Sequence, residues 1–251
     1  MRTKIFTTLL LALAATSLPL SGEAYSNSDL NAVLAGADCP GGDLSGADLS
    51  GMDLSGRDFT NTDFTEARLD GTRLDKAKLS DACFQSAILA RASLRSASLR
   101  HANFAYATAT AADFTNADLY GAYLYRTQLH GAHLLNANLQ QAKAQEASMD
   151  GVQADYADFS FANLPYSWLR RASLKNAVFY GTNAYCAHLE KSDLTEADLR
   201  SGKLGHANLA GSKLTGAKLD RAMLEYADLR EAELTYTQFG TAFLDNAKMD
   251  K

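Results

Sequence analysis

Proline, cysteine and tryptophan are scarce in this chain of 251 residues, which contains three, three and one of them respectively. With three prolines and 17 glycines, the composition is unlike that of collagen, of a proline-rich linker or of modules strung on linkers. An excess of positive charge is absent as well, because 24 Lys and Arg residues stand against 29 Asp and Glu residues. The formal net charge of −5 excludes a basic nucleic-acid-binding surface, which needs concentrated positive charge.

Apolar residues, by contrast, are plentiful. They make up 47% of the chain, 21% of the residues are charged, and the mean hydropathy is −0.20. This balance supplies enough apolar surface to bury a core, so the chain is expected to fold rather than remain disordered.

A long apolar run lies near the N-terminus, from Ile5 to Leu20, and Arg2 and Lys4 precede it. Gly22-Glu23-Ala24 follows, with small residues at the two positions that a signal peptidase reads. The pattern predicts a cleavable signal peptide over residues 1–24. It places the mature protein in the periplasm, or in the thylakoid lumen if the source is photosynthetic. An uncleaved anchor is the alternative, but the run is short, so no stable membrane insertion is expected after cleavage.

The rest of the chain repeats every five residues. Stepping by five from Leu34 to Met249 gives 44 positions, of which 29 are Leu and 8 are Phe. The residue two places earlier is Ala in 31 of the repeats. We therefore assign residues 32–251 to one repetitive domain, preceded by a short lead-in at residues 25–31.

A five-residue period fits neither regular secondary structure. On an α-helix, five steps of about 100° would spread the leucines around the cylinder. In a flat strand, an odd period would point successive leucines to opposite faces. The chain must therefore bend once per repeat, always in the same direction, and keep the large residue and the preceding Ala inside.

The repeats follow the pattern A(D/N)LXX, as in Ala47-Asp48-Leu49, Ala117-Asp118-Leu119 and Ala162-Asn163-Leu164. This pattern resembles that of the pentapeptide-repeat family. The resemblance implies an all-β fold, a right-handed four-sided β-solenoid with one repeat per side and about 11 coils. Stacked at about 4.8 Å, the coils would form a rod roughly 50 Å long.

With 20 residues per coil, residues that are 20 positions apart fall in the same column of the solenoid. Phe64, Phe84 and Phe104 fall in one inward column, so we expect their rings to stack. The coil that contains Ala144 and Met149 is expected to be the least well filled. Arg57 occupies a position where most repeats have Ala, and its side chain is expected to extend outward at a corner.

The sequence offers few candidate catalytic or metal-binding residues. Cys39 and Cys83 are separated by roughly two coils, and Cys186 lies further along, so no internal disulfide is expected. Cys186 and His206 are 20 residues apart and stack on one outward column, with His188 nearby. Such a group suits zinc or a nucleophile, but no further ligand, orienting carboxylate or cleft is evident. We predict no catalytic residue, no metal and no cofactor, and hence no enzyme.

Three classes of function remain. The first is an exported scaffold or interaction rod that binds a protein partner. The second, implied by the resemblance, is mimicry of DNA that binds topoisomerases and gives fluoroquinolone resistance. It needs a continuous acidic face, whereas aspartates such as Asp38 and Asp58 are followed by Lys78 in the same column. The third, ice binding through Thr195, Thr215 and Thr235, is discarded because charged residues flank that column.

Aromatic residues concentrate at outward positions in the middle of the rod. Arg170 and Arg171 flank them, and exposed aromatics edged by arginine are typical of binding surfaces. The alternative is structural: tyrosine suits strand surfaces, and Trp168 covers a bulge caused by Pro165. The predicted partner-binding residues are Phe161, Tyr166, Trp168, Tyr180, Tyr185, His188 and Tyr125.

The repeats continue to the last residue of the sequence, which leaves the layer with Leu244 and Met249 uncovered. Uncovered solenoid ends are prone to pair with other chains. We therefore predict self-association through this coil as a homodimer; the alternative is a frayed open end.

Overall fold

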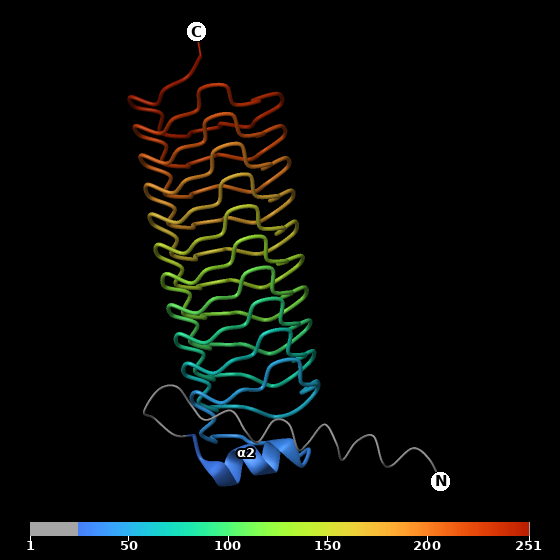
Figure 1. Cartoon of the computed structure of the whole chain (residues 1–251). Helices are drawn as coiled ribbons and strands as arrows, with labels where there is room; N and C mark the ends of the chain where they lie inside the picture. The colour runs from blue at the N-terminus through green and yellow to red at the C-terminus, as the bar shows by residue number, and fades with distance from the viewer. Residues whose placement is uncertain (1–24, 251) are drawn as a thin grey trace, which may run out of the picture.

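The computed structural model describes residues 25–250, which form a four-sided column of stacked coils (Figure 1). The colour runs steadily from blue at one end of the column to red at the other, so the coils follow one another in chain order (Figure 1). The predicted signal peptide, residues 1–24, lies outside the described residues. The fold is the predicted right-handed β-solenoid. Within residues 25–250, no helix has the length and apolar character to cross a membrane.

Each coil pairs with the next through parallel bridges between residues that are 20 positions apart, from Asp43 and Asp63 to Asp228 and Lys248. The N–H of Leu44 donates to the carbonyl of Asp63 across 2.8 Å, and the N–H of Asp63 donates to the carbonyl of Gly42 across 2.9 Å. The same pattern recurs along the column. This register confirms that four repeats make one coil.

The bends come from a turn in every repeat. The N–H of Ala47 donates to the carbonyl of Leu44 across 3.1 Å, and Gly46 between them has φ of 67°. Positive φ recurs at every fifth residue from Gly36 to Asn246, with Gly240 one place before the expected position, and the 13 glycines and 30 other residues include no Val, Ile or Thr. β-Branched side chains resist this conformation. One left-handed residue per repeat therefore turns the chain in the same direction at each corner.

The interior is filled as the inward columns predict. The rings of Phe64 and Phe84 stack with centroids 4.9 Å apart, and those of Phe84 and Phe104 at 4.7 Å. Where Thr replaces the inward Ala, its hydroxyl is satisfied by the coil below, as for Thr127, which donates to the carbonyl of Phe104 across 2.7 Å. Most of the few polar groups in the core are thus hydrogen-bonded, with the hydroxyl of Ser212 as an exception.

A small interior cavity lies outside the coil predicted to be the least well filled. Met149 is fully buried, whereas an apolar cavity of about 10 Å³ occurs beside Ala184 and Gly202. Two inward positions of adjacent coils are short there, with Ala184 in place of Leu and Gly202 in place of Ala. The adaptable side chain of Met149 is packed inside its own coil.

One α-helix, α2 (Asn27–Leu34), lies across the N-terminal end of the column (Figure 1). Its N-cap is Ser26, whose hydroxyl accepts from the N–H of Asp29 across 3.3 Å, and its buried residue is Val33. The predicted start of the solenoid at residue 32 thus falls inside α2, and Cys39 is the first inward residue after it. The helix covers the apolar layer of the first coil.

The predicted outward direction of Arg57 is wrong. Its Nη1 atom donates to the carbonyl of Val33 across 3.0 Å, and its Nε and Nη2 atoms are buried. A carbonyl at the end of a helix carries partial negative charge and lacks an intrahelical donor. The side chain therefore points toward α2 rather than toward solvent.

Candidate protein-binding surface

Trp168 and His188 lie on one wall, in adjacent coils, and are joined by a parallel bridge. Their rings stack with centroids 4.1 Å apart and an interplanar angle of 9°. Trp168 is 36% exposed although it is the single tryptophan of the chain. The turn of each repeat sets the direction of these side chains, so they are held outward by the same backbone geometry that builds the core.

Tyr166 and Tyr185 lie at the corner next to that wall. Their rings meet edge to face at 6.1 Å, and both are exposed. A shallow depression is lined by Tyr166, Trp168 and His188, together with Arg126 and Glu146. We call it the tryptophan depression. The structure thus brings the corner and wall residues onto one continuous surface.

Tyr125 joins this surface from two coils nearer the N-terminus. It lines a second shallow depression with Pro165 and Tyr166, and the intervening coil contributes Gln145 and Glu146. We call it the tyrosine depression. The two depressions share Tyr166 and Glu146. We define the aromatic surface as Tyr125, Tyr166, Trp168, Tyr185 and His188.

Phe161 and Tyr180 form a separate pair at the preceding corner, with ring centroids 5.5 Å apart. Between that corner and the aromatic surface lie Asn163 and Asn183, whose side-chain amides are hydrogen-bonded across 2.7 Å. One side of the column therefore separates these two predicted residues from the other five. Phe161 remains the most exposed of the seven, at 58%.

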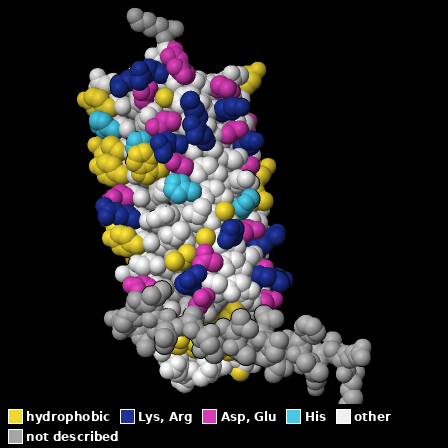
Figure 2. Space-filling view, in the orientation of Figure 1, with side chains coloured by type: hydrophobic (Ala, Val, Ile, Leu, Met, Phe, Trp, Pro, Cys, Tyr) yellow, Lys and Arg dark blue, Asp and Glu magenta, His cyan; other side chains and the backbone are white. Residues whose placement is uncertain are grey.

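The sequence analysis missed two residues that extend the aromatic surface. The ring of His206 lies 5.4 Å from that of Tyr185 and stacks at 4.8 Å on that of Tyr226. Tyr166, His206 and Tyr226 share one outward column of the 20-residue coil, so the period contained the signal. Figure 2 shows hydrophobic side chains and histidines side by side along one edge of the upper half of the column.

Most cations over these rings are paired with carboxylates. Arg170 lies 4.7 Å above the ring of Trp168 and forms an ion pair with Asp150. Arg126 lies 5.2 Å from the ring of Tyr125 and donates to Glu146 across 2.8 Å. A cation over an aromatic face is attracted by the ring quadrupole. The aromatic surface is consequently rigid and nearly neutral.

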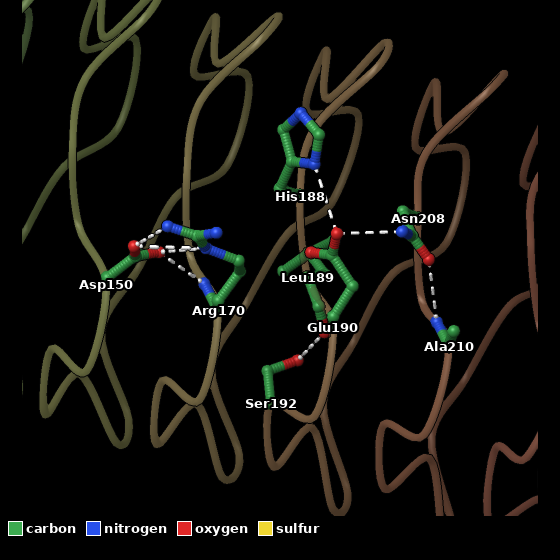
Figure 3. Close-up of polar contacts among 8 residues, drawn as sticks. All are labelled: Asp150, Arg170, His188, Leu189, Glu190, Ser192, Asn208 and Ala210. Atoms are coloured by element: carbon green, nitrogen blue, oxygen red, sulfur yellow. Dashed lines mark hydrogen bonds and ion pairs between the residues drawn. The ribbon is translucent and has the colours of Figure 1, made fainter.

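A polar network supports the stacked pair from the side (Figure 3). His188 Nδ1 is 3.1 Å from Glu190 Oε1, which accepts from Asn208 Nδ2 across 2.7 Å. Burial raises the pKa of Asp150, but the hydrogen bonds and charge of Arg170 outweigh it and leave that pKa below its ordinary value. These contacts fix the imidazole of His188 against the indole.

The cysteine and histidine group gains no ligand from the fold. Among residues 25–250, no three His, Cys, Asp or Glu side chains come together in a way that would hold a metal ion. Cys39, Cys83 and Cys186 are all free thiols. One carboxylate, Glu190, does lie 3.1 Å from His188 Nδ1, although the sequence analysis expected no orienting carboxylate.

Three of the aspartates of the first coils form ion pairs with basic residues of the next coil. Asp53 and Arg73 are bridged partners and form an ion pair at 3.1 Å, and Asp58 and Lys78 do the same at 3.1 Å. Asp48 and Arg68 stand in the same relation at 4.0 Å. The predicted interruption of the acidic column by a basic residue thus takes the form of an ion pair between Asp58 and Lys78.

At the C-terminal end of the described column, the inward side chains are less covered. Leu234, Phe239 and Leu244 are half-buried, and Met249 is 39% exposed. In the middle of the column the same inward positions are buried. The surface predicted for self-association is thus apolar and accessible in residues 25–250.

Among solved structures, the chain is similar to HetL of the cyanobacterium Nostoc sp. strain PCC 7120, a pentapeptide repeat protein involved in heterocyst differentiation regulation. The identity is 26%, the match covers 90% of this chain and 98% of HetL, and the TM-score is 0.81. A pentapeptide repeat protein of the Arabidopsis thaliana thylakoid lumen matches with 33% identity over 46% of this chain and 66% of its own, with a TM-score of 0.34.

QnrB1, a plasmid-mediated fluoroquinolone resistance protein, matches at 17% identity, 81% and 89% coverage of the two chains, and a TM-score of 0.39. No curated protein sequence gives a significant match. The family model of the pentapeptide repeat region matches residues 57–134, and that of the pentapeptide repeats matches 30–51 and segments that together span 132–250. The chain belongs to the pentapeptide-repeat family.

Proposed function

We propose that this chain is an exported, non-enzymatic rod that binds a protein partner through the aromatic surface. The observation that carries the proposal is the exposed Trp168, held between His188 and Arg170. Burial in a core would stabilise a large apolar side chain such as that of tryptophan. Its place on the exposed wall therefore favours a role in contact with a partner.

The aromatic surface has the physical properties of an interface anchor. Tyrosine, tryptophan and arginine dominate the binding energy of interfaces because they bury large areas at a small cost in conformational entropy. Here the stacked and edge-to-face contacts have already fixed the rings in the free protein. A partner would therefore meet a preorganised surface.

The structural alternative explains less. Tyrosine on strand surfaces accounts for scattered rings such as Tyr156 and Tyr236, which have no ring neighbour among the described contacts. It does not account for four aromatic side chains that line two adjoining depressions, nor for the ring contact of Tyr185 with one of them. The bulge expected at Pro165 does not explain Trp168 either, because the bridging of Trp168 to Ser148 and His188 is regular.

Two further observations bear on the class of function. HetL, which shares this architecture over 98% of its length, is involved in regulation, and a binding role without catalysis agrees with that. The ion pairs of Asp48, Asp53 and Asp58 remove the continuous negative face that DNA mimicry requires. We therefore favour protein binding over topoisomerase binding. Export is proposed from the signal pattern of residues 1–24.

Proximity labelling and pull-down in the native compartment test the proposal. Trp168→Ala and Tyr166→Ala should each reduce capture of the main partner at least tenfold, with circular dichroism unchanged. Tyr156→Ala and Tyr236→Ala are matched controls, because these exposed tyrosines lie at another corner. Equal capture by all four variants would make the aromatic surface structural. Cell fractionation with N-terminal sequencing tests export, and cytoplasmic residence would refute it.

A further inference from the structure

We propose that an acidic, extended segment of the protein partner binds along the side of the column that lies between Phe161 and Tyr166. This inference rests on the proposed function and names the chemistry of the segment that reaches this side. Three features carry it: the charge of the side, its hydrogen-bond donors and its continuity with the aromatic surface. We call this surface the asparagine side, and it consists of five stacked stretches, residues 120–126, 140–146, 160–166, 180–186 and 200–206.

The asparagine side is positively charged although the chain as a whole is acidic. Its stretches contain four basic residues and a single carboxylate, that of Glu146. The basic residues are Arg126, Lys143, Arg200 and Lys203. Arg126 forms an ion pair with Glu146, and Arg200 forms one with Asp198 on the neighbouring wall. Lys143 and Lys203 are exposed and have no carboxylate partner among the ion pairs of residues 25–250, so two positive charges remain uncompensated.

Two asparagines lie between these lysines and offer hydrogen-bond donors. Asn163 and Asn183 are bridged partners in adjacent coils, and Nδ2 of Asn183 donates to Oδ1 of Asn163 across 2.7 Å. Oδ1 of Asn183 in turn accepts from the N–H of Tyr185 across 3.3 Å. Each amide oxygen thus already accepts a hydrogen bond. The N–H groups left on the two Nδ2 atoms are suited to the oxygen acceptors of a ligand, and carboxylates are the strongest such acceptors.

The four donor side chains form one row along the column. Lys143, Asn163, Asn183 and Lys203 are joined by successive parallel bridges, one residue per coil. Three coil spacings of about 4.8 Å place the backbones of the two lysines about 14 Å apart. In an extended segment, side chains at positions i and i+4 lie on the same face and about 13 Å apart. Acidic residues at this spacing would each reach one lysine, with a polar residue over the asparagines between them.

Aromatic rings border the row at both corners. Phe161 and Tyr180 form one border, and Tyr166 and Tyr185 form the other. The ring of Phe161 is held against the next coil, where a Cβ at Gly181 would lie 2.8 Å from its Cε1 atom. Rings fixed in this way keep water away from the polar contacts that they surround, which strengthens those contacts.

The asparagine side continues directly into the aromatic surface. Lys143 lines the tyrosine depression together with Tyr125 and Tyr166, and its ammonium lies 4.2 Å over the ring of Tyr123. A partner that covers Trp168 therefore needs to extend around only one corner to reach the row of donors. Such a partner would also meet the aromatic pair on the preceding corner, which lies outside the aromatic surface.

A labelled peptide tests the inference directly. The probe is fluorescein-labelled Thr-Glu-Val-Ser-Val-Glu-Thr, whose glutamates stand at positions i and i+4, and its anisotropy is recorded while the full chain is added at low salt. We expect saturable binding that weakens as salt is added. The isomer Thr-Glu-Val-Ser-Glu-Val-Thr places its glutamates on opposite faces and should bind several-fold more weakly. A peptide with glutamine in place of both glutamates should not bind.

Variants of the chain test whether the probe binds to this side of the column. Lys203→Gln should weaken binding several-fold, and Asn183→Asp should weaken it at least tenfold because it adds a carboxylate to the row. The matched control is Lys191→Gln, since Lys191 is an exposed lysine at another corner and has no ion pair within residues 25–250. This control should bind the probe as the natural chain does. Both row variants should also reduce capture of the native partner, with circular dichroism unchanged.

No saturable binding up to roughly 1 mM of the chain, an affinity too weak for recognition, would overturn the inference. So would equal affinity for the two isomeric peptides, or an equal effect of Lys203→Gln and Lys191→Gln. Binding of polygalacturonate in place of the peptide would overturn it in favour of an acidic glycan. If partner capture depends on Trp168 but not on Lys203 or Asn183, this inference falls and the proposed function stands. If capture depends on none of the three, both proposals fall.

Discussion

Arg57 donates a hydrogen bond from Nη1 to the carbonyl oxygen of Val33 across 3.0 Å, and this bond ties the first coil to the C-terminal end of α2. Burial lowers the pKa of Arg57, but an arginine side chain stays charged at any physiological pH. Its guanidinium also lies 5.1 Å from the centroid of Phe59. One side chain thus links the helix that covers the column to its first inward aromatic ring.

Replacement of Arg57 should loosen α2 more than the rest of the column. A hydrogen bond from a charged donor contributes about 1.5–3 kcal/mol, and part of this is offset by the cost of burying the guanidinium. We expect Arg57→Ala to accelerate amide exchange at Leu30 and Ala35, whose N–H groups are bonded within the helix, by about tenfold. Arg57→Met keeps the apolar stem and separates packing from the bond. Unchanged exchange in both variants would show that the bond contributes nothing.

The stacked phenylalanines should be the most costly residues to truncate. Phe84 is fully buried and stacks on both Phe64 and Phe104. Phe84→Ala should lower the free energy of unfolding by about 3–5 kcal/mol, because the cavity cannot collapse between two rigid rings. Phe84→Leu, the residue most common at this position of the repeat, should cost less. Denaturant unfolding followed by circular dichroism measures both, and equal costs would contradict the role given to the stack.

The five-residue period of the sequence predicts the parts of the fold that repeat with it. The period shows that Leu and Phe at every fifth position point inward, and the four repeats per coil that the family resemblance implies then place residues 20 apart, such as Trp168 and His188, in adjacent coils. The helix α2 and the direction of Arg57 do not follow, since both lie where the repeat is broken. Their positions depend on which surface remains uncovered at the end of the column, which no local pattern encodes.

The candidate site was predictable in part for the same reason. The columns place Tyr166 near Trp168, and the step of five residues from Phe161 to Tyr166 already corresponds to a full side of the column. The pairing of Arg170 with Asp150 one coil below, however, requires side-chain conformations that periodicity leaves open. Packing against neighbours in adjacent coils settles those conformations.

One turn departs from the others, at Gly240 and Thr241. The left-handed residue there is Gly240, with φ of 48°, and Thr241 donates from its N–H and its hydroxyl to Asp220 Oδ1 at 2.9 and 3.0 Å. Thr is β-branched and resists positive φ, so the turn moves back by one residue. Gly240→Ala should cost about 1–2 kcal/mol, because it places a Cβ in a left-handed conformation.

The same substitution should cost less in a Thr241→Asn background, since Asn accepts positive φ and allows the regular turn to return. Thermal unfolding of the two single variants and the double variant measures this coupling. Additive costs would mean that Thr241 does not cause the irregular turn.

Arg230 should control the ionisation of Asp228. Hydrogen bonds from Arg230, with Nε 2.9 Å from Oδ1, outweigh the effect of burial and lower the pKa of Asp228 to about 2. A lowered carboxyl pKa stabilises the fold above the ordinary value of about 3.9, and this stabilisation is lost as the pH falls from there through 2. Because the side chain of Arg230 is 56% exposed, the contribution should stay below about 1 kcal/mol.

Arg230→Ala should return the pKa of Asp228 toward its ordinary range, and carboxyl chemical shifts in an NMR titration measure it. The matched control is Arg221→Ala, because Arg221 pairs with Asp220 and has no contact with Asp228. If the pKa of Asp228 stays at about 2 in Arg230→Ala, the lowering comes from Lys248 or from the backbone hydrogen bond instead.

Self-association through the C-terminal coil is the last prediction. Leu244 is half-buried and Met249 is 39% exposed, both at inward positions that are buried in the middle of the column. Two such ends related by a two-fold axis would bury both apolar layers and pair their outermost backbone groups in an antiparallel arrangement. Light scattering at micromolar concentration should therefore give the mass of a dimer.

Leu244→Glu and Met249→Glu should give the mass of a monomer, because each would bury an unpaired carboxylate. Tyr236→Glu is the control, since Tyr236 points outward at a corner and is 84% exposed. A monomer at all concentrations, together with rapid amide exchange in the last coil, would identify this end as frayed rather than paired.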